Sequence, residues 1–155
     1  MVLMEIKEVN IRDLRKIVSL EQKIFKKNAF SKNLIKKLIL NNLLFLKLEI
    51  SKIRKELAGF IIVVKNGKDK VNIINFLIKP KYQNKGYGSY LLQETIKKIK
   101  TLSGIKKIIL NVQVSNSVAI KLYEKYHFKK NSIIIEKYYP SGESAFLMEL
   151  NINSL

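Results

Sequence analysis

Apolar residues recur along the chain with two different periods. In Ile11–Phe25 and Gly86–Leu102 they return every three or four positions, which is typical of a helix that buries one face. Other apolar segments are shorter and either alternate with polar residues or run continuously, which is typical of strands. The expected strands are Glu5–Val9, Leu43–Ile50, Leu57–Lys65, Val71–Lys79, Ile105–Val114, Phe128–Tyr139 and Ser144–Leu150, and the remaining expected helices are one that begins after Ser31 and Ser115–Tyr126.

Residues with capping and turn preferences separate these elements. Asn10 and Ser31 are suited to cap the first two helices, because their side-chain oxygens accept hydrogen bonds from free N–H groups. Asn66-Gly67 is a strong hairpin signal, and Pro140-Ser141-Gly142 predicts a second hairpin. The order of elements predicts a mixed α/β fold with about seven strands in one sheet, about four helices on both of its faces, and a single domain over residues 1–155.

The residue types exclude several kinds of site. Apolar residues make up 47% of the 155 residues, which is normal for a globular protein. The chain has no Cys, so a disulfide scaffold, a thiolate zinc site and a Cys nucleophile are ruled out. The single His, His127, leaves almost nothing from which to build a His-based metal site or a Ser-His-Asp triad. No metal is therefore expected.

The charge is strongly unbalanced, with 30 basic and 12 acidic residues and a net charge of +18. All the basic residues are Lys except Arg12, Arg15 and Arg54. Two interpretations remain open: a generally solvated basic surface, in line with the Lys/Ile/Asn composition of an AT-rich genome, or a selected attraction for anions. The scarcity of Arg, the usual bidentate reader of bases and phosphates, argues against sequence-specific recognition of nucleic acid.

The N-terminal segment is unlike a signal peptide. Met1–Val9 contains Glu5 and Glu8 and has no long apolar run. The longest apolar runs, such as Phe60–Val64, are too short to cross a bilayer. We therefore expect a soluble, cytoplasmic protein with no membrane partner.

The most informative segment joins a strand to a helix. The strand that ends in Phe76-Leu77-Ile78 runs through Pro80 into Gln83-Asn84-Lys85-Gly86-Tyr87-Gly88-Ser89. The two glycines let backbone N–H groups approach an anion, and the helix N-terminus adds partial positive charge, which is an arrangement for holding a pyrophosphate. The segment is neither a Walker A loop nor a dinucleotide fingerprint. On glycine spacing alone, an ordinary strand-to-helix turn explains it equally well.

Three motifs together resemble one family. Gln83-x-x-Gly86-x-Gly88 resembles the acetyl-CoA pyrophosphate loop, Gln/Arg-x-x-Gly-x-Gly/Ala, of the GNAT acetyltransferase superfamily. The segment 116–125 resembles that family's Asn-x-x-Ala-x-x-Leu-Tyr helix, and the order of elements is that of the GNAT fold over essentially the whole chain. The segment 138–148 resembles the closing hairpin of the protein N-terminal acetyltransferases, which include the bacterial ribosomal-protein alanine enzymes and the archaeal-type enzymes.

This resemblance implies acetyl-CoA as the acetyl donor. Phe76, Leu77 and Ile78 would present backbone groups to the pantetheine arm and the acetyl carbonyl. The pyrophosphate would be held by the loop, whose residues are Gln83, Asn84, Lys85, Gly86, Tyr87, Gly88 and Ser89. Asn116 matches a position that contacts the pantetheine arm, although a role as helix cap alone remains open.

The resemblance also implies a catalytic and a substrate-binding set. Tyr123 would protonate the departing CoA thiolate, because a phenol with a pKa of about 10 stays protonated at neutral pH; a buried core tyrosine is the alternative. Tyr138 and Tyr139 would hold the N-terminal peptide, unless they are only an aromatic pair on a strand. Phe30, between the first two helices, would shape the pocket for the first residue of the substrate.

Two positions depart from the family pattern. Asn111 stands where the bacterial ribosomal-protein enzymes carry a Glu, so the general base of those enzymes is not carried over. His127 replaces the usual Gly after the fourth helix, and we expect it to adopt the left-handed conformation that ends helices.

The sequence as a whole predicts an enzyme that transfers acetyl from acetyl-CoA to the N-terminal α-amine of a protein, with a ribosomal protein as a candidate substrate, by direct attack in a ternary complex. Two alternatives remain open. One is a GNAT enzyme that acts on a Lys side chain or a small amine, although a charge of +18 would repel polyamines. The other is a non-catalytic basic module that binds ribosomes or RNA.

Overall fold

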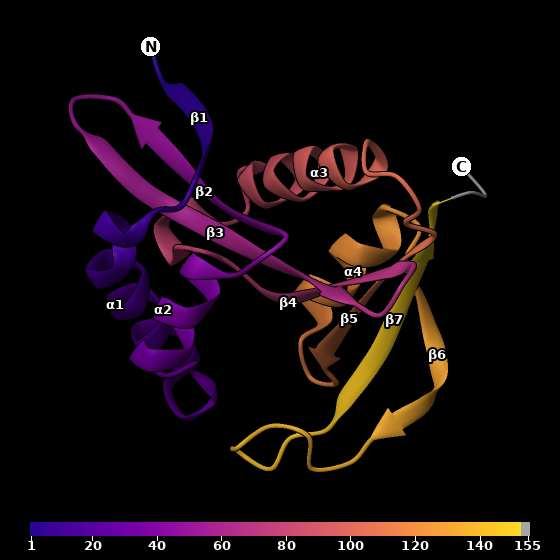
Figure 1. Ribbon diagram of the computed structural model, residues 1–155. Coiled ribbons are helices and arrows are strands. Elements are labelled where there is room, and N and C mark those ends of the chain that lie inside the picture. Colours follow the sequence, from indigo (N-terminus) through magenta and orange to yellow (C-terminus); the bar gives the residue numbers. More distant parts are fainter. Residues whose placement is uncertain (153–155) are drawn as a thin grey trace.

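A single seven-stranded sheet runs through the computed structural model, which describes residues 1–152 (Figure 1). The helices are α1 (Leu14–Phe25), α2 (Lys32–Leu40), α3 (Tyr87–Lys100) and α4 (Ser117–Lys125). In their order across the sheet, the strands are β1 (Leu3–Glu8), β2 (Leu44–Ser51), β3 (Lys55–Asn66), β4 (Lys70–Ile78), β5 (Lys107–Gln113), β7 (Ala145–Asn151) and β6 (Lys129–Ile135). Strands β4 and β5 are parallel and the other neighbours are antiparallel, so the predicted mixed α/β architecture is confirmed.

The helices cover the two faces of the sheet in pairs. Successive side chains of a strand point to opposite faces, so β3 sends Phe60 and Ile62 to one side and Ile61 and Val63 to the other. Helices α1 and α2 cover the Phe60 face, whereas α3 and α4 cover the Ile61 face (Figure 1). This division leaves β4 and β5, at the centre of the sheet, between two separate layers of helix.

The first helix starts differently from the prediction. Residues Ile11–Asp13 form a 3-10 turn, and the α-helix begins only at Leu14. Asn10 accepts a hydrogen bond from the Arg12 N–H at 2.9 Å and its own N–H donates to Asp13 at 2.9 Å, which tightens this first turn. The expected cap at Ser31 is confirmed, because its hydroxyl accepts from the Leu34 N–H at 3.1 Å.

His127 ends α4 in the predicted left-handed conformation, with φ of 73°. The Phe128 N–H donates to the Tyr123 carbonyl and the His127 N–H donates to the Glu124 carbonyl, both at 3.0 Å. These are the two hydrogen bonds of a Schellman motif, which needs a positive φ at this position. The role of His127 in ending α4 is therefore enough to explain its conformation.

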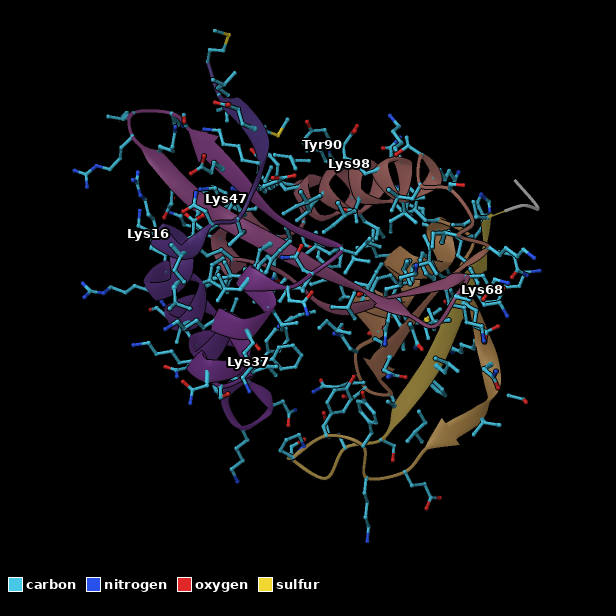
Figure 2. The ribbon with its side chains drawn as sticks, in the orientation of Figure 1. Lys16, Lys37, Lys47, Lys68, Tyr90 and Lys98 are labelled. Atoms are coloured by element: carbon cyan, nitrogen blue, oxygen red, sulfur yellow. The ribbon has the colours of Figure 1, made fainter. Side chains whose placement is uncertain are left out.

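Lysines project from every part of the surface in view. Figure 2 shows exposed Lys16 on α1, Lys37 on α2, Lys68 in the β3–β4 turn and Lys98 on α3. Such scatter favours the generally solvated basic surface over one selected anion-binding face. Within residues 1–152, no helix is long and apolar enough to cross a membrane.

Candidate active site

The main cavity opens where β4 and β5 stop pairing. Their parallel pairs run from Lys70–Lys107 to Ile73–Leu110, while β4 continues to Ile78 and β5 to Gln113. A cavity of about 550 Å³ lies in this region, lined from α1, β4, the loop before α3, β5, α4 and the β6–β7 connection. The early end of the β4–β5 ladder leaves backbone groups of both strands free to face a ligand.

The loop before α3 borders one end of the cavity and presents backbone N–H groups. Gln83 ties it to β4 by donating its side-chain amide to the Ile78 carbonyl at 2.8 Å. Asn84 and Gly86 have φ of 60° and 85°, and Gly86 caps α3 without any side-chain hydrogen bond to the first turn. The N–H groups of that turn point along the helix axis and suit an anion such as a pyrophosphate.

The two glycines of this loop have room around them. A Cβ on Gly86 would meet no protein atom within 4 Å, and one on Gly88 would lie at an ordinary 3.5 Å from Ile78 Cγ1. Protein packing therefore does not require glycine at either position. The positive φ explains Gly86 in part, and the open space beside it fits a ligand that approaches the backbone.

A charged cluster supports the turn that leads into this loop. Glu56 at the start of β3 accepts from Lys79 Nζ at 2.7 Å and pairs with Lys81 Nζ at 2.8 Å, and its second oxygen accepts from the Tyr82 hydroxyl. The hydrogen bonds from Lys79, Lys81 and Tyr82 lower the pKa of Glu56 to about 2. The turn at residues 79–82 is thereby anchored to β3 immediately before the loop that leads into α3.

Tyr123 projects from α4 into the same cavity and is 7% exposed. Its ring packs against Phe76 of β4 and against Phe128, with ring centroids 6.3 and 5.7 Å apart. Burial, followed by the proximity of Tyr139, raises the pKa of Tyr123 above its ordinary value. The phenol therefore stays protonated at neutral pH and is able to donate a proton.

The remaining predicted cofactor residues fall into two groups. Nine of them line the cavity, namely Phe76, Leu77, Ile78, Gln83, Asn84, Gly86, Gly88, Ser89 and Asn116. Lys85 is exposed and the Tyr87 ring packs edge-on against Tyr82, so neither side chain forms part of the cavity wall. Only their backbone groups are placed to take part in an anion site. Asn116 also caps α4, because its Oδ1 accepts from the Ala119 N–H at 3.1 Å.

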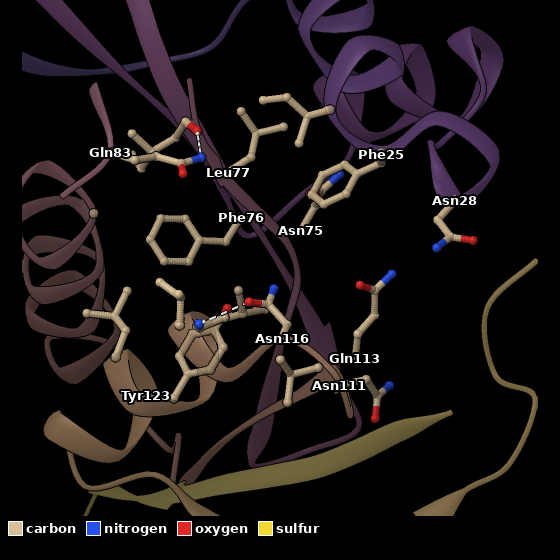
Figure 3. A pocket seen from close by; sticks show the side chains of 18 of the residues that line it. Phe25, Asn28, Asn75, Phe76, Leu77, Gln83, Asn111, Gln113, Asn116 and Tyr123 are labelled. Carbon is tan, nitrogen blue, oxygen red and sulfur yellow. Dashed lines mark hydrogen bonds between the residues drawn. The ribbon is translucent and has the colours of Figure 1, made fainter. Parts of the chain in front are cut away.

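Two of the three predicted substrate residues line the same cavity. Phe30, from the α1–α2 connection, and Tyr139, from the β6–β7 connection, both line it. Tyr138 does not line it, because its ring stacks edge-on against Tyr139 at 4.8 Å and its hydroxyl accepts from Asn111 Nδ2 at 3.0 Å. Figure 3 shows Gln83, Phe76 and Tyr123 toward one side of the cavity and Asn28 and Asn111 toward the other.

Sequence analysis did not identify a buried polar pair in the same cavity. Glu21 of α1 and Asn75 of β4 both line it, and Asn75 Nδ2 donates to Glu21 Oε1 at 2.7 Å. The signal was present in the sequence, because Glu21 lies next to Leu20 within the apolar stripe of its helix and Asn75 interrupts an apolar strand. Polar residues at core positions of this kind usually have a partner or a function.

Comparison with known proteins identifies the family. The profile of the acetyltransferase (GNAT) family matches residues 15–128, and the chain therefore belongs to that family. The ribosomal-protein-S18-alanine N-acetyltransferase from Escherichia coli has a similar structure, with a TM-score of 0.80 and 26% identity over 97% of this chain and 94% of that one. NAA60 of Arabidopsis thaliana, solved in complex with acetyl-CoA, shares the fold with a TM-score of 0.84 and 17% identity over 97% of this chain and 99% of that one.

Sequence relatives cover less of the chain. An N-alpha-acetyltransferase from Sulfurisphaera tokodaii is 37% identical over 79 residues, which are 51% of this chain and 47% of the relative. The ribosomal protein bS18-alanine N-acetyltransferase of Salmonella typhimurium is 34% identical over 88 residues, which are 55% of this chain and 58% of that protein. The chain thus spans about half the length of the relatives it matches.

Proposed function

We propose that this chain transfers an acetyl group from acetyl-CoA to the N-terminal α-amine of a protein. The observation that carries the proposal is one cavity that joins a loop of unpaired N–H groups, a strand that leaves its ladder, and a buried protonated tyrosine. The names of two groups of relatives, N-alpha-acetyltransferase and ribosomal protein bS18-alanine N-acetyltransferase, support an N-terminal amine as the acceptor.

The residues present fit acetyl-CoA. The open space at Gly86 lets a pyrophosphate reach the N–H groups of the first turn of α3, and the cavity is long enough to extend from there to Tyr123 and Phe30. When bound, acetyl-CoA supplies the thioester whose acetyl group is transferred. The lysines of the surface add a general attraction for its negative charges.

The protein contributes position and a proton. Phe76, Leu77 and Ile78 lie beyond the last pair of the β4–β5 ladder, and their backbone groups that face away from β3 would bind the pantetheine arm and polarise the acetyl carbonyl. The Ile78 carbonyl is not among them, because it accepts from Gln83. Tyr123 donates its proton to the sulfur that leaves, and the proton that the attacking nitrogen loses passes to water, from which the phenol is protonated again. Phe30 and Tyr139 hold the peptide at the other end of the cavity, so the amine attacks directly in a ternary complex.

The choice of substrate follows from charge and from the missing base. Asn111 cannot take a proton as a carboxylate does, and both oxygens of Glu21, the carboxylate that lines the cavity, already accept from Phe30 and Asn75. The lack of a free carboxylate among the described residues of the cavity favours the less basic α-amine over Lys. The basic surface favours acidic residues after the first few positions of the substrate, and ribosomal proteins are one candidate class. A cytoplasmic location is part of the same proposal.

Mass spectrometry of N-terminal peptides tests the proposal. Protein N-termini incubated with the enzyme and acetyl-CoA gain one acetyl group at the α-nitrogen. Calorimetry with acetyl-CoA separates this proposal from a basic RNA-binding module, because a module that has lost catalysis need not retain cofactor affinity. Absence of both binding and acetylation would reject the enzyme.

A further inference from the structure

The connection between α1 and α2, residues 26–31, is fastened to the sheet by a buried carboxylate. Glu21 of α1 is fully buried, and its Oε2 accepts from the Phe30 N–H at 2.8 Å. Its Oε1 accepts from Asn75 Nδ2 of β4 at 2.7 Å. Among the residues that the structure describes, Glu21 is the only carboxylate that lines the cavity. Burial of a carboxylate is costly unless it is well hydrogen-bonded, so its presence here needs an explanation.

The neighbouring helices do not need Glu21 for their own ends. At the end of α1 the Lys26 N–H already donates to the Gln22 carbonyl. At the start of α2 the Ser31 hydroxyl caps the helix by accepting from the Leu34 N–H. The bond from Phe30 to Glu21 therefore serves the connection itself, and the bond from Asn75 fixes that connection to β4.

This tie lies between the loop before α3 and the α1–α2 connection, because Asn75 lies between Gln83 and Asn28 (Figure 3). Asn75 and Leu77 are two residues apart on β4 and point to the same face, toward α1 and α2. If the thioester enters from the loop before α3, the amine arrives from the side of the α1–α2 connection. Glu21 thus links the wall that meets the incoming substrate to the strand that borders the acetyl group.

Hydrogen bonds to a carboxylate hold this wall firmly. The pKa of Glu21 is raised, because burial outweighs the hydrogen bonds from Phe30 and Asn75, which act in the opposite direction. Its two oxygens accept hydrogen bonds at 2.8 and 2.7 Å, so the α1–α2 connection and β4 are both held by the same side chain. A wall held in this way has a fixed shape, which is what discrimination between substrate side chains requires.

We propose that Glu21 is a positioning residue that sets the pocket for the first residue of the substrate, and that this pocket takes an apolar side chain. The preference for an apolar side chain follows from the groups that line the cavity beside Glu21. Glu21 and Asn75 hydrogen-bond each other, and the adjoining wall has the apolar residues Ile24, Phe25 and Phe30. The polar Asn28 of the same wall is already hydrogen-bonded to Ser141. An acidic first side chain would meet these apolar groups and the Glu21 carboxylate, with no cation among the described residues that line the cavity. This inference rests on the proposed N-terminal acetyltransferase function.

Two substitutions whose side chains are similar in length to Glu separate the effect of the Glu21 hydrogen bonds from the effect of its side-chain volume. Glu21→Met keeps much of the volume but has no acceptor for Phe30 or Asn75. Glu21→Gln accepts from the Phe30 N–H with its oxygen and donates to Asn75, once the Asn75 amide turns over to present its oxygen. Glu124→Gln, at an exposed carboxylate on α4, is the matched control.

The assay measures kcat and KM for peptides that begin with Met, Ala, Ser or Asp, together with acetyl-CoA affinity by calorimetry. Wild-type enzyme should prefer Met or Ala to Asp. Glu21→Met should raise KM for the preferred peptides and reduce the preference by about tenfold or more, as expected for the loss of a hydrogen bond to a charged group. Glu21→Gln should recover most of the preference, and acetyl-CoA affinity should change by less than about twofold in both, because the cofactor end is distant.

A folded Glu21→Met enzyme with the wild-type preference would overturn the inference while leaving the proposed function intact. A wild-type preference for Asp over Met would also overturn it. If Glu21→Met does not fold, Asn75→Leu supplies the second test, because it frees Glu21 from β4 and should reduce the same preference. Wild-type enzyme that binds acetyl-CoA but acetylates none of the peptides would reject the proposed function, and this inference with it.

Discussion

Asn28 and Ser141 exchange two hydrogen bonds although they are 113 positions apart in the chain. Asn28 Nδ2 donates to the Ser141 hydroxyl at 3.1 Å, and the Ser141 N–H donates to Asn28 Oδ1 at 2.9 Å. The pair joins the α1–α2 connection to the β6–β7 connection beside the cavity, of which Asn28 is a wall residue. The two segments expected to hold the peptide are thus tied to each other.

Loss of this pair should weaken peptide binding. Asn28→Ala removes both bonds, each worth about 1 kcal/mol or less at an exposed site, so KM for an N-terminal peptide should rise by about three- to tenfold. Affinity for acetyl-CoA should stay the same, because the loop before α3 is untouched. Asn33→Ala, at an exposed position on α2, is the control. Equal KM values for the two variants would show that the pair does not shape the peptide site.

A negative charge at Gly86 should sharply reduce acetyl-CoA affinity. Gly86→Asp places a carboxylate in the open space where the pyrophosphate is expected. Gly86→Asn is the matched variant, since Asn and Asp have similar size and both tolerate a positive φ. Calorimetry should show a far larger loss for Asp than for Asn. Equal losses would indicate that shape, and not charge, decides the effect, and unchanged affinity in both would reject the loop as the pyrophosphate site.

Removal of the Tyr123 hydroxyl should slow the chemical step. Tyr123→Phe keeps the ring contacts with Phe76 and Phe128, so the fold should survive. The variant should lower kcat by about 10²- to 10⁴-fold, the range for one general acid, with little change in acetyl-CoA affinity. Because the pKa of Tyr123 is raised, wild-type kcat should not fall through loss of this proton below about pH 10. Wild-type turnover in the variant would leave Tyr123 with a packing role only.

Glu56 should contribute stability that depends on pH. Its folded pKa is about 2 against an ordinary 4.5, so this contribution is present above pH 4.5 and is lost as pH falls toward 2. Glu56→Gln lacks it. The difference in melting temperature between wild type and variant should therefore be constant from pH 7 to pH 5 and shrink below pH 4.5. A difference that did not depend on pH would contradict the ion-pair account of the turn at residues 79–82.

The sequence was sufficient to predict the fold and many of the residues that line the cavity. Helical and strand periods, the caps at Asn10 and Ser31 and the Gly86–Gly88 spacing are local signals, and each predicted element is present with boundaries shifted by a few residues. The shift at the first helix has a local cause, because the reciprocal bonds between Asn10 and Asp13 favour a tighter first turn.

The rest of the site depends on contacts between distant segments. Glu21 meets Asn75 across 54 positions, and Asn28 meets Ser141 across 113. The apolar pattern marks Glu21 and Asn75 as polar residues at core positions, but it does not identify a partner for either of them or for Asn28 and Ser141, because the partners meet only when the sheet and helices assemble. For the same reason, the positions of Lys85, Tyr87 and Tyr138 outside the cavity wall could not be read from motif spacing.

Competition between two peptides across pH 6.5–9 tests the central claim most directly. One peptide has a free N-terminus, and its counterpart is N-blocked and carries an internal Lys. An α-amine has a pKa of about 7.8 and a Lys side chain about 10.4, a gap of about 2.6 units or about 3.5 kcal/mol. At pH 7.5 about a third of α-amines are neutral, but only about one Lys in a thousand. With Asn111 in place of a carboxylate, the account predicts that the enzyme strongly prefers the free N-terminus at pH 7.5. The difference between the two acetylation rates should narrow as the pH rises. Comparable rates at pH 7.5 would contradict it and indicate a lysine acetyltransferase with a different base.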